Sequence, residues 1–275
     1  IGVRVSPCPP ASPVSGMGAF LPPGWRVLRH DSLESTNATA RDLALRGCPE
    51  GTVVLADEQT EGRGRLGRSW HSPAGRGLWV SVVFRPGLEQ ARLPQLTLLA
   101  AVAVARAVEA CAGVSPGIKW PNDLLAGGRK LCGILCEIVD SGREGEAPAV
   151  VAGIGLNVNQ RAGEYPEPLR PVATSLFLET GCRWSRRLLL GHLLAQLEEL
   201  YRDWRGNGFA GVRREWIARS ATLGRRVCLD QGPGRIEGEA WSLDRDGALL
   251  VRDDVGVVHR VDSGEIHGPS SADDT

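Results

Sequence analysis

The chain has 275 residues, of which 42% are hydrophobic and 23% charged, and its 32 basic residues balance its 32 acidic ones. That length and apolar content suffice for one large domain with a buried core and a second, small one. Balanced charge argues against a general nucleic-acid or membrane-surface binder, because both classes depend on an excess of Lys and Arg. The longest apolar run, 98–105, is far shorter than the roughly 20 residues of a membrane-spanning helix.

The N-terminal segment 1–20 is rich in Pro, Ser, Gly and Ala and shows no periodicity, so we expect a disordered extension. Its prolines interrupt the stretch where a signal peptide would carry an apolar core. Met17, the only methionine, is a candidate start of translation. Seven cysteines lie scattered without the spacing of metal ligands, which predicts reduced, mostly buried thiols in a cytoplasmic protein.

Residues 21–221 carry helical and strand patterns in mixed order, which predicts one large α+β domain. Ser35-Thr36-Asn37 precedes the first helix as a capping segment, and Gly47 ends it. Val-rich runs between Gly and Pro predict strands, and Leu-rich periodic runs predict helices. In chain order we expect a helix over 38–46, strands over 52–56 and 78–84, a helix over 93–111, strands over 130–139 and 149–158, and helices over 185–204 and 211–219.

The character of the sequence changes near residue 222. Short strands over 226–230, 235–243, 248–252 and 257–261 alternate with Gly- and Asp-containing turns such as Asp246-Gly247. About 50 residues of this kind predict a small barrel or sandwich over 222–270, followed by a tail over 271–275.

Lysine is almost absent: 30 of the 32 basic residues are arginines, and the two lysines are Lys119 and Lys130. This bias suggests a coding sequence that uses Arg wherever a positive charge suffices. Because Lys is a compact point charge and Arg a planar fork, a retained Lys marks a position where Arg does not fit. The alternative is chance at either position.

The segment 61–70, Glu-Gly-Arg-Gly-Arg-Leu-Gly-Arg-Ser-Trp, alternates glycine with arginine. Glycine lets the backbone approach a ligand closely, and guanidinium groups suit phosphate. The segment is neither a Walker loop nor a dinucleotide fingerprint, since no Gly-Lys-Ser/Thr follows and it does not open a helix in a βαβ unit. A solvated Arg-rich turn and an RNA-contacting Gly-Arg stretch are the alternatives.

In a second segment both lysines flank a carboxylate and an amide, in Lys119-Trp120-Pro121-Asn122-Asp123 and then Lys130. Proline keeps the preceding residue extended, so we expect Asn122 and Asp123 in a turn at a strand end. An Asp near lysine and phosphate can bind magnesium or accept a proton from an attacking amine. An Asp that only closes a turn is the alternative.

A third segment, Gly153-Ile154-Gly155-Leu156-Asn157-Val158-Asn159, combines two glycines and two amides at a strand end. Glycine in a strand permits the close approach of a ligand. A β-bulge followed by polar turn residues would give the same pattern.

Taken in this order, the segments resemble the biotin–protein ligases, which make biotinyl-AMP and pass biotin to a lysine. The resemblance covers residues 25–268 and includes the C-terminal region, which looks like the family's SH3-like domain. It implies a mixed β-sheet with packed helices, similar to class II synthetases, as the catalytic domain over 21–221, plus a small SH3-like β-barrel. The matching stretches are 34–37, 59–70, 119–123, 129–135 and 153–157.

The resemblance also implies site residues. Polar contacts to the ureido ring of biotin are expected from Ser35, Thr36, Asn37 and Gln59, because buried amides need partners; a Ser or Thr here could equally be a helix cap. Glycines would let the backbone close over the ring and the valeryl chain. The full set implied for biotin is Ser35, Thr36, Asn37, Gln59, Gly62, Arg63, Arg65, Lys130, Gly133 and Gly153.

For the chemistry, the resemblance implies that Lys130 lies between the biotin carboxylate and the α-phosphate of ATP, where an ammonium neutralises two anions. Asp123 is the expected base or orienter for the acceptor lysine and a possible Mg²⁺ ligand. Catalysis is assigned to Lys130, Arg65 and Asp123. Trp70 would close over adenine, unless it is a plain core residue. The set implied for ATP is Arg63, Arg65, Arg68, Trp70, Asn122, Lys130 and Asn157.

The implied partner is the biotin carboxyl carrier domain of a biotin-dependent carboxylase, with the ligase a monomer or homodimer. The DNA-binding domain of the family's ligase-repressors is missing ahead of residue 25, so we expect a short form without specific DNA binding or membrane association. A lipoate–protein ligase or octanoyltransferase, and an RNA-binding module with an SH3-like domain, are the alternatives. Three glycines and few apolar anchors also predict that 62–68 is poorly ordered until ligands bind.

Overall fold

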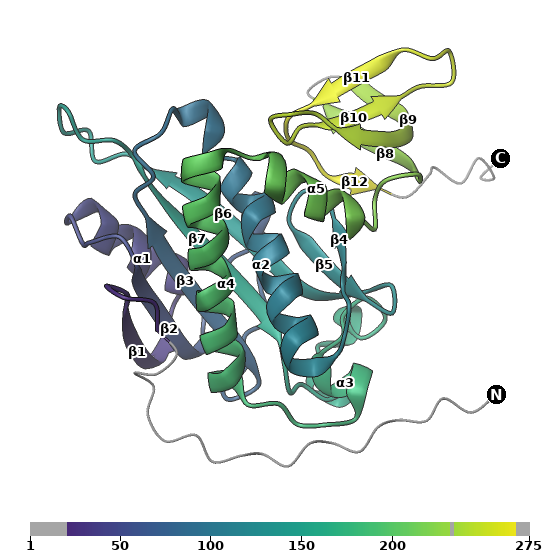
Figure 1. Cartoon of the computed structure of the whole chain (residues 1–275). Helices are drawn as coiled ribbons and strands as arrows, with labels where there is room; N and C mark the ends of the chain where they lie inside the picture. Colours follow the sequence, from purple (N-terminus) through teal and green to yellow (C-terminus); the bar gives the residue numbers. More distant parts are fainter. Residues whose placement is uncertain (1–20, 232–233, 268–275) are drawn as a thin grey trace.

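The computed structural model describes residues 21–231 and 234–267, which form two β-sheets with covering helices (Figure 1). The strands of the larger sheet are β1 (Arg26–Leu33), β2 (Thr52–Gln59), β3 (Gly77–Phe84), β4 (Gly117–Lys119), β5 (Asp123–Ala126), β6 (Arg129–Val139) and β7 (Ala149–Asn157). They lie in the order β1-β2-β3-β7-β6-β5-β4. Since β1 and β2 run parallel and all other neighbours antiparallel, the sheet is mixed, as expected.

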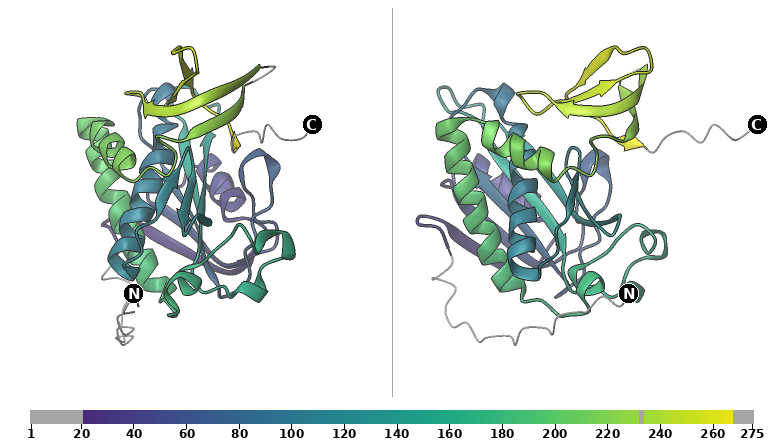
Figure 2. Two further views of the ribbon diagram at one scale, coloured as in Figure 1. Left: turned by 90° about the vertical axis from the view of Figure 1, so that its right-hand side faces the viewer. Right: turned by 45° about the vertical axis from the view of Figure 1, so that its right-hand side comes forward.

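Helices cover both faces of this sheet (Figure 2). They are α1 (Thr36–Leu45), α2 (Gln95–Ala112), α3 (Leu176–Thr180), α4 (Arg186–Asn207) and α5 (Ala210–Ala218). Short polar side chains start several of them: Ser35 accepts a hydrogen bond from the Ala38 amide at α1, and Ser185 one from the Leu188 amide at α4. α1 packs on β2, β3 and β7, whereas α2 and α4 pack on each other and on the opposite face.

The core therefore has two parts, separated by the sheet. Every residue of β3 is buried, because this central strand is covered on both faces. A small cluster, including Ala40, Val54, Val83 and Val151, lies under α1. The larger cluster lies under α2 and α4 and continues into the C-terminal sheet.

Among the described residues, one segment, 90–112, is long and apolar enough to cross a membrane by length and composition. It contains α2, and 67% of the apolar window is buried inside the protein. Burial of that extent is typical of a core helix.

The C-terminal region forms a separate five-stranded antiparallel sheet. Its strands are β8 (Arg226–Gln231), β9 (Gly234–Leu243), β10 (Leu249–Arg252), β11 (Val258–Val261) and β12 (Ile266–His267), in the order β11-β10-β9-β8-β12. The edge strands β11 and β12 do not pair with each other within the described residues, so the expected closed barrel is corrected to an open sheet. The reason is length: β12 contributes only two paired positions, both to β8.

Most elements expected from the sequence are confirmed within two or three residues, but five were missed. β1 carries charged residues at exposed positions, and β4, β5, α3 and β12 are too short to show a period. The expectations for residues 1–20, including Met17, and for 271–275 lie outside the described residues.

The six described cysteines differ in burial: only Cys132 and Cys228 are buried, and the other four are half-buried. The expectation of mostly buried thiols is therefore wrong. Burial still raises the pKa of Cys111 and Cys136 to about 11, so both are protonated at neutral pH.

Candidate active site

A trough of glycines lies on the same face of the large sheet as α1, in the part of that face that α1 does not cover. Gly153 on β7 lies between Ser81 of β3 and Leu135 of β6, and Gly155 lies beside Gly133 of β6. Cross-strand partners point to the same face of a sheet, so these glycines leave a strip without side chains. The sequence therefore leaves a hollow over the middle of the sheet, and polar groups lie around its edge.

The glycines leave room for side chains and backbone groups of the protein itself. A Cβ at Gly153 would overlap the Asn37 amide oxygen, and one at Gly133 would press on the Trp70 ring. At Gly62 it would meet the Trp70 carbonyl oxygen and the Ser72 hydroxyl. Asn37 and Trp70 thus line the hollow as fixed walls.

At one end of the hollow lies a neutral hydrogen-bonded network. The Thr36 amide and hydroxyl both donate to Gln59 Oε1, at 2.8 and 3.0 Å. Gln59 Nε2 donates to the Ser72 hydroxyl at 2.8 Å. Ser35, Thr36 and Asn37 are each at most 5% exposed. Ser35 caps α1, so the capping alternative is correct for this residue at the same time as it lines the cavity.

Asn37 is fixed by residues that sequence reasoning did not single out. Its Nδ2 donates to the Leu135 carbonyl oxygen at 3.1 Å and to the Glu137 carboxylate at 2.6 Å. The buried Ser81 hydroxyl lies within donating distance of Asn37 Oδ1, at 2.6 Å, and of Thr36 Oγ1, at 2.8 Å. Ser81 is the only polar side chain in the apolar run of β3, and that interruption was the available signal.

At the other end lies the Gly-Arg loop, folded as a small hairpin. The Gly64 amide donates to the Arg68 carbonyl at 2.7 Å, and the Trp70 amide donates to the Gly62 carbonyl at 2.8 Å. A 3₁₀ turn over Arg65–Gly67 places Leu66 in the left-handed region at φ 56°, with its side chain exposed. Such a backbone is unusual for a leucine and marks the loop tip as strained.

The loop arginines have protein partners, contrary to the expectation of few anchors. Arg65 donates to Asn122 Oδ1 at 3.0 Å and to the Gly264 carbonyl at 3.2 Å. Arg68 forms an ion pair with Glu265 from the C-terminal region. Burial lowers the pKa of Arg65, although nearby Asp123 and Glu265 oppose this, and a guanidinium keeps its charge in either case. Arg63 is exposed and forms no ion pair within the described chain.

Lys130 and Asp123 stand at the junction of the two ends. Lys130 Nζ lies 2.8 Å from Asp123 Oδ1 and 5.2 Å from the centre of the Trp70 ring. Asp123 Oδ1 is buried and accepts no well-aligned hydrogen bond from the described residues. Asp123 therefore neutralises Lys130 through charge alone, and its carboxylate retains capacity for another donor or a cation.

The two site asparagines have different roles. Asn122 donates to the Ile134 carbonyl at 2.8 Å and accepts from Arg65, so it positions that guanidinium. Asn157 is 3% exposed, donates to the Thr174 carbonyl and accepts from Gln160, each at 2.9 Å. Both groups of the Asn157 amide are thus already bonded to protein, although the residue borders the cavity.

A single cavity of about 290 Å³ joins these groups and runs from Ser35 to the C-terminal residues 264–266. Of the predicted site residues, only Gly62 does not line it, since Gly62 is buried against Trp70 and Ser72. Residues missed from the sequence also line it, namely His71, Tyr165, Gly264 and Glu265. The last two come from the far end of the chain and have no local sequence signal.

The metal capacity of the site is limited. No three His, Cys, Asp or Glu side chains gather in a metal-binding group among the residues that the structure describes. Mg²⁺ is commonly held by one or two carboxylates together with substrate phosphates and water. Asp123, with its buried and poorly satisfied oxygen, fits that minimal donor set.

Comparisons with known proteins agree with this arrangement. The profile of the biotin/lipoate A/B protein ligase family matches residues 30–157, and that of the biotin protein ligase C-terminal domain matches 222–267. The bifunctional ligase/repressor BirA of Bacillus subtilis is 41% identical over 85% of this chain and 71% of its own. The biotin–[acetyl-CoA-carboxylase] ligase of Mycobacterium tuberculosis is 37% identical over 85% of each chain.

A solved structure is also similar to this chain in fold. Biotin protein ligase from Aquifex aeolicus, in complex with biotin and ATP, aligns with a TM-score of 0.77 and 31% identity. The alignment covers 88% of this chain and 97% of that one.

Proposed function

Because the chain belongs to the biotin–protein ligases, we propose that its cavity activates biotin with ATP and transfers it to a carrier lysine. A biotin carboxylate oxygen attacks the α-phosphorus of ATP, which gives biotinyl-5′-AMP and releases pyrophosphate. The lysine amine then attacks the acyl carbon and AMP leaves. The observation that carries the proposal is the single cavity with a neutral hydrogen-bonding end, a cationic end, and Lys130 between them.

The neutral end suits the ureido ring. An uncharged cyclic urea presents N–H donors and a carbonyl acceptor, which lose their water when buried and need partners. Thr36, Asn37 and Gln59 supply amide and hydroxyl groups that are already fixed by Ser81 and Glu137. Fixed neutral groups recognise an uncharged ring with little reorganisation on binding.

The cationic end suits the triphosphate. Arg63, Arg65 and Arg68 all line the cavity. Guanidinium forks match phosphate oxygens in geometry and charge. Lys130 is placed to neutralise both the attacking carboxylate and the α-phosphate, and the negative charge that builds up between them in the transition state. Its compact ammonium explains why lysine is retained in an Arg-rich chain.

Mg²⁺ fits this end with Asp123 as its carboxylate ligand, alongside phosphate oxygens and water. When bound, the ion would withdraw charge from the phosphates and so ease the departure of pyrophosphate. This chain's own residues hold the nucleotide from the other side, through the loop arginines and Asn122. The contacts of Trp70 with Gly133 and Gly155 place it as a wall of the cavity, and stacking on adenine is the further role we assign to it.

In the transfer step we assign Asp123 to the acceptor lysine. A lysine amine must lose a proton to attack, and a carboxylate within hydrogen-bond reach can accept or orient that proton. Asp123 is the carboxylate beside Lys130 at the centre of the cavity. The carrier is a domain of a carboxylase, as the names of the relatives indicate.

The alternative inside the same superfamily is lipoate or octanoate transfer. These acyl chains lack a urea, so they cannot exchange hydrogen bonds with the amides and hydroxyls at the neutral end. The C-terminal domain match and the relatives' names also favour biotin. The RNA-binding alternative has no support from these comparisons.

ATP–pyrophosphate exchange tests the proposal. The protein is incubated with Mg-ATP, labelled pyrophosphate and biotin, lipoate or octanoate, and we expect exchange with biotin alone. Addition of a purified carrier domain should then raise its mass by one biotinyl group. Exchange without biotin, or faster with lipoate than with biotin, would contradict the assignment.

A cytoplasmic location, a monomer or homodimer, and the absence of specific DNA binding remain our expectations. The balanced charge of the chain supports the last of them, since specific DNA binders draw much of their affinity from phosphate contacts.

A further inference from the structure

The turn between β4 and β5 is held from the C-terminal side of the molecule. The Ile118 amide donates to the Arg219 carbonyl, and the Ala221 amide donates to the Ile118 carbonyl, both at 2.8 Å. The Trp120 amide donates to the Thr222 hydroxyl at 2.9 Å. The strand that leads into Asn122 and Asp123 is thus anchored to the linker between the two sheets.

A hairpin of the C-terminal sheet, residues 243–248, completes this support. The buried indole of Trp120 donates to the Gly247 carbonyl at 3.3 Å. Gly247 has a φ of 97°, and a Cβ there would press on Leu98 of α2, so only glycine allows this approach. The hairpin tip therefore rests against both α2 and the residue two positions before Asn122.

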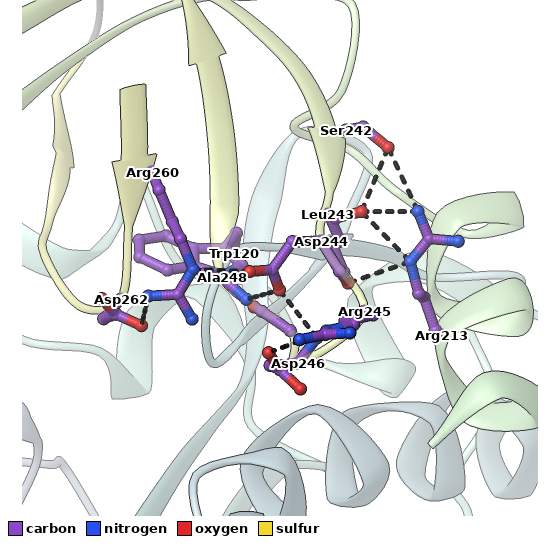
Figure 3. Close-up of polar contacts among 11 residues, drawn as sticks. Trp120, Arg213, Ser242, Leu243, Asp244, Arg245, Asp246, Ala248, Arg260 and Asp262 are labelled. Carbon is purple, nitrogen blue, oxygen red and sulfur yellow. Dashed lines mark hydrogen bonds and ion pairs between the residues drawn. The ribbon is translucent and has the colours of Figure 1, made fainter. Parts of the chain in front are cut away.

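Arg213 of α5 holds the base of the hairpin (Figure 3). Its Nε donates to the carbonyls of Leu243 and Asp244 at 3.1 and 3.0 Å, and its Nη2 donates to Leu243 at 2.5 Å. Charge-assisted bonds from a rigid fork to two consecutive carbonyls fix a backbone more firmly than neutral bonds do. These carbonyls are the last of β9 and the first of the turn.

Arg213 stands on a fixed helix. Arg106 of α2 forms an ion pair with Glu215, and Arg219 forms one with Glu109 of α2 at 2.7 Å. α5 is thereby tied to α2 at two points that follow Arg213, at Glu215 and at Arg219 just past the end of the helix, so the guanidinium of Arg213 has little freedom to follow the hairpin. The chain of contacts runs from α2 through Arg213 and the hairpin to Trp120.

We infer that the 243–248 hairpin is a positioning element for the nucleotide end of the cavity, and that Arg213 is the positioning residue that holds it. The inference rests on the proposed function. If the hairpin shifts, Trp120 loses its indole partner, and Asn122 and Asp123 move with it. The contacts at risk are those of Asn122 with Arg65 and of Asp123 with Lys130. The neutral network around Asn37 has no bond to the hairpin.

The test compares Arg213→Ala with Arg213→Lys and Trp120→Phe, using Arg214→Ala as control, since Arg214 is exposed on the same helix. The measurements are KM for ATP and kcat in biotin-dependent pyrophosphate exchange, biotin affinity by calorimetry, and the folded fraction by circular dichroism. We expect Arg213→Ala to reduce kcat/KM for ATP about tenfold to a hundredfold, the usual effect of misplacing reacting groups by about 1 Å. Biotin affinity should change less than twofold.

Arg213→Lys should recover part of the loss, because an ammonium can still donate to a carbonyl, and Arg214→Ala should match the wild type. Trp120→Phe should reproduce the ATP effect. The double variant Arg213→Ala/Trp120→Phe should lose less kcat/KM for ATP than the product of the two single losses, since both substitutions act through one hairpin.

Equal kcat/KM for ATP in folded Arg213→Ala and wild type would overturn the inference, as would equal losses of biotin and ATP affinity or independent effects in the double variant. The proposed function fails separately, if wild-type protein shows no biotin-dependent exchange at all.

Discussion

The two ends of the cavity are built differently. The neutral end, from Thr36 to Gln59 with Ser81 and Asn37, is buried and bonded within one domain. The cationic end is half exposed, and its charges are balanced by Asp123 and by C-terminal residues 264–265. The neutral end is fully hydrogen-bonded within the protein before any ligand binds. The cationic end instead keeps its cations paired with protein groups that a nucleotide must replace.

This difference suggests a division of labour. A rigid neutral pocket gives selectivity for an uncharged ring, because its fixed amides and hydroxyls can bond the donors and acceptor of the ring but gain nothing from an analogue that lacks them. Exchangeable ion pairs keep the arginines from repelling one another in the free protein, and they cost little to break because the exposed pairs are weak. Phosphate can therefore replace the protein partners of these cations at a small cost in free energy.

The largest effect should come from Lys130→Arg. A longer, forked cation cannot occupy the place of an ammonium between two anions, so we expect biotinyl-AMP synthesis to fall about a hundredfold to a thousandfold, the usual cost of a lost transition-state donor. Arg129→Lys, the reverse exchange at the neighbouring position, is the control. Single-turnover synthesis of biotinyl-AMP measures both, and near-normal synthesis in Lys130→Arg would refute the role of Lys130.

Gly153→Ala should break the other end alone. Its methyl group would displace the Asn37 amide, so we expect the affinity for biotin to fall about tenfold or more while the affinity for ATP without biotin is unchanged. Gly163→Ala, where a Cβ meets open space, should behave like the wild type. Calorimetric titration with each ligand decides, and an equal loss for both ligands would show that the two ends are not separable.

A pH effect of about 1–2 kcal/mol should appear at Asp244, which closes the hairpin under Trp120. Burial alone would raise the pKa of Asp244, but hydrogen bonds from Arg260 and from the amides of Asp246 and Ala248 hold it below its usual value. Its folded pKa lies below its unfolded one, so its contribution to stability is complete above about pH 4 and disappears as pH falls through the lowered folded value.

Chemical denaturation from pH 7 to pH 2 checks this. Asp244→Asn should be less stable than the wild type at pH 7, and the difference should shrink in acid. Asp246→Asn, at an exposed neighbour, should change little. A difference that stays constant with pH would exclude the ionised carboxylate as its cause.

The smallest effect should come from the ion pair between Arg68 and Glu265. The Arg68 side chain is 64% exposed, so Glu265→Gln should lower the free energy of unfolding by less than about 1 kcal/mol, and added salt should erase the change. Thermal unfolding at low and high salt measures it. A larger or salt-independent loss would show that the cationic end is as firmly built as the neutral one.

Local patterns predicted the parts of the fold that have a period or a clear boundary. Ser35 predicts the start of α1, the Leu-rich repeat predicts α4, and the Val-rich runs predict β2, β3 and β7. β1 was not predicted, because it carries charged residues at exposed positions and has no apolar run. Whether the C-terminal sheet closes into a barrel could not be predicted, because closure depends on how many residues of the two edge strands can pair with each other.

The site divides in the same way. The Gly-Arg loop, both lysines and the glycines of β7 were visible as motifs, and the lysines, those glycines and the three arginines of the loop border the cavity. What fills the space over each glycine was not visible, since Asn37 and Trp70 reach it from other elements. Glu265 and Gly264 meet the loop from about 200 residues away, and no local pattern encodes that contact.

Hydrogen exchange on residues 61–70 and on the neutral end, 35–37 and 77–84, tests the central contrast most directly. We predict fast exchange in the loop of the free protein, slowed strongly when biotin and ATP bind together, and slow exchange at the neutral end in every state. Closure would also exclude water from the reactive anhydride, and by linkage biotin and nucleotide would tighten each other's binding by the same factor. Equal protection of the loop with and without ligands would contradict the account, because the cationic end would then be as preformed as the neutral one.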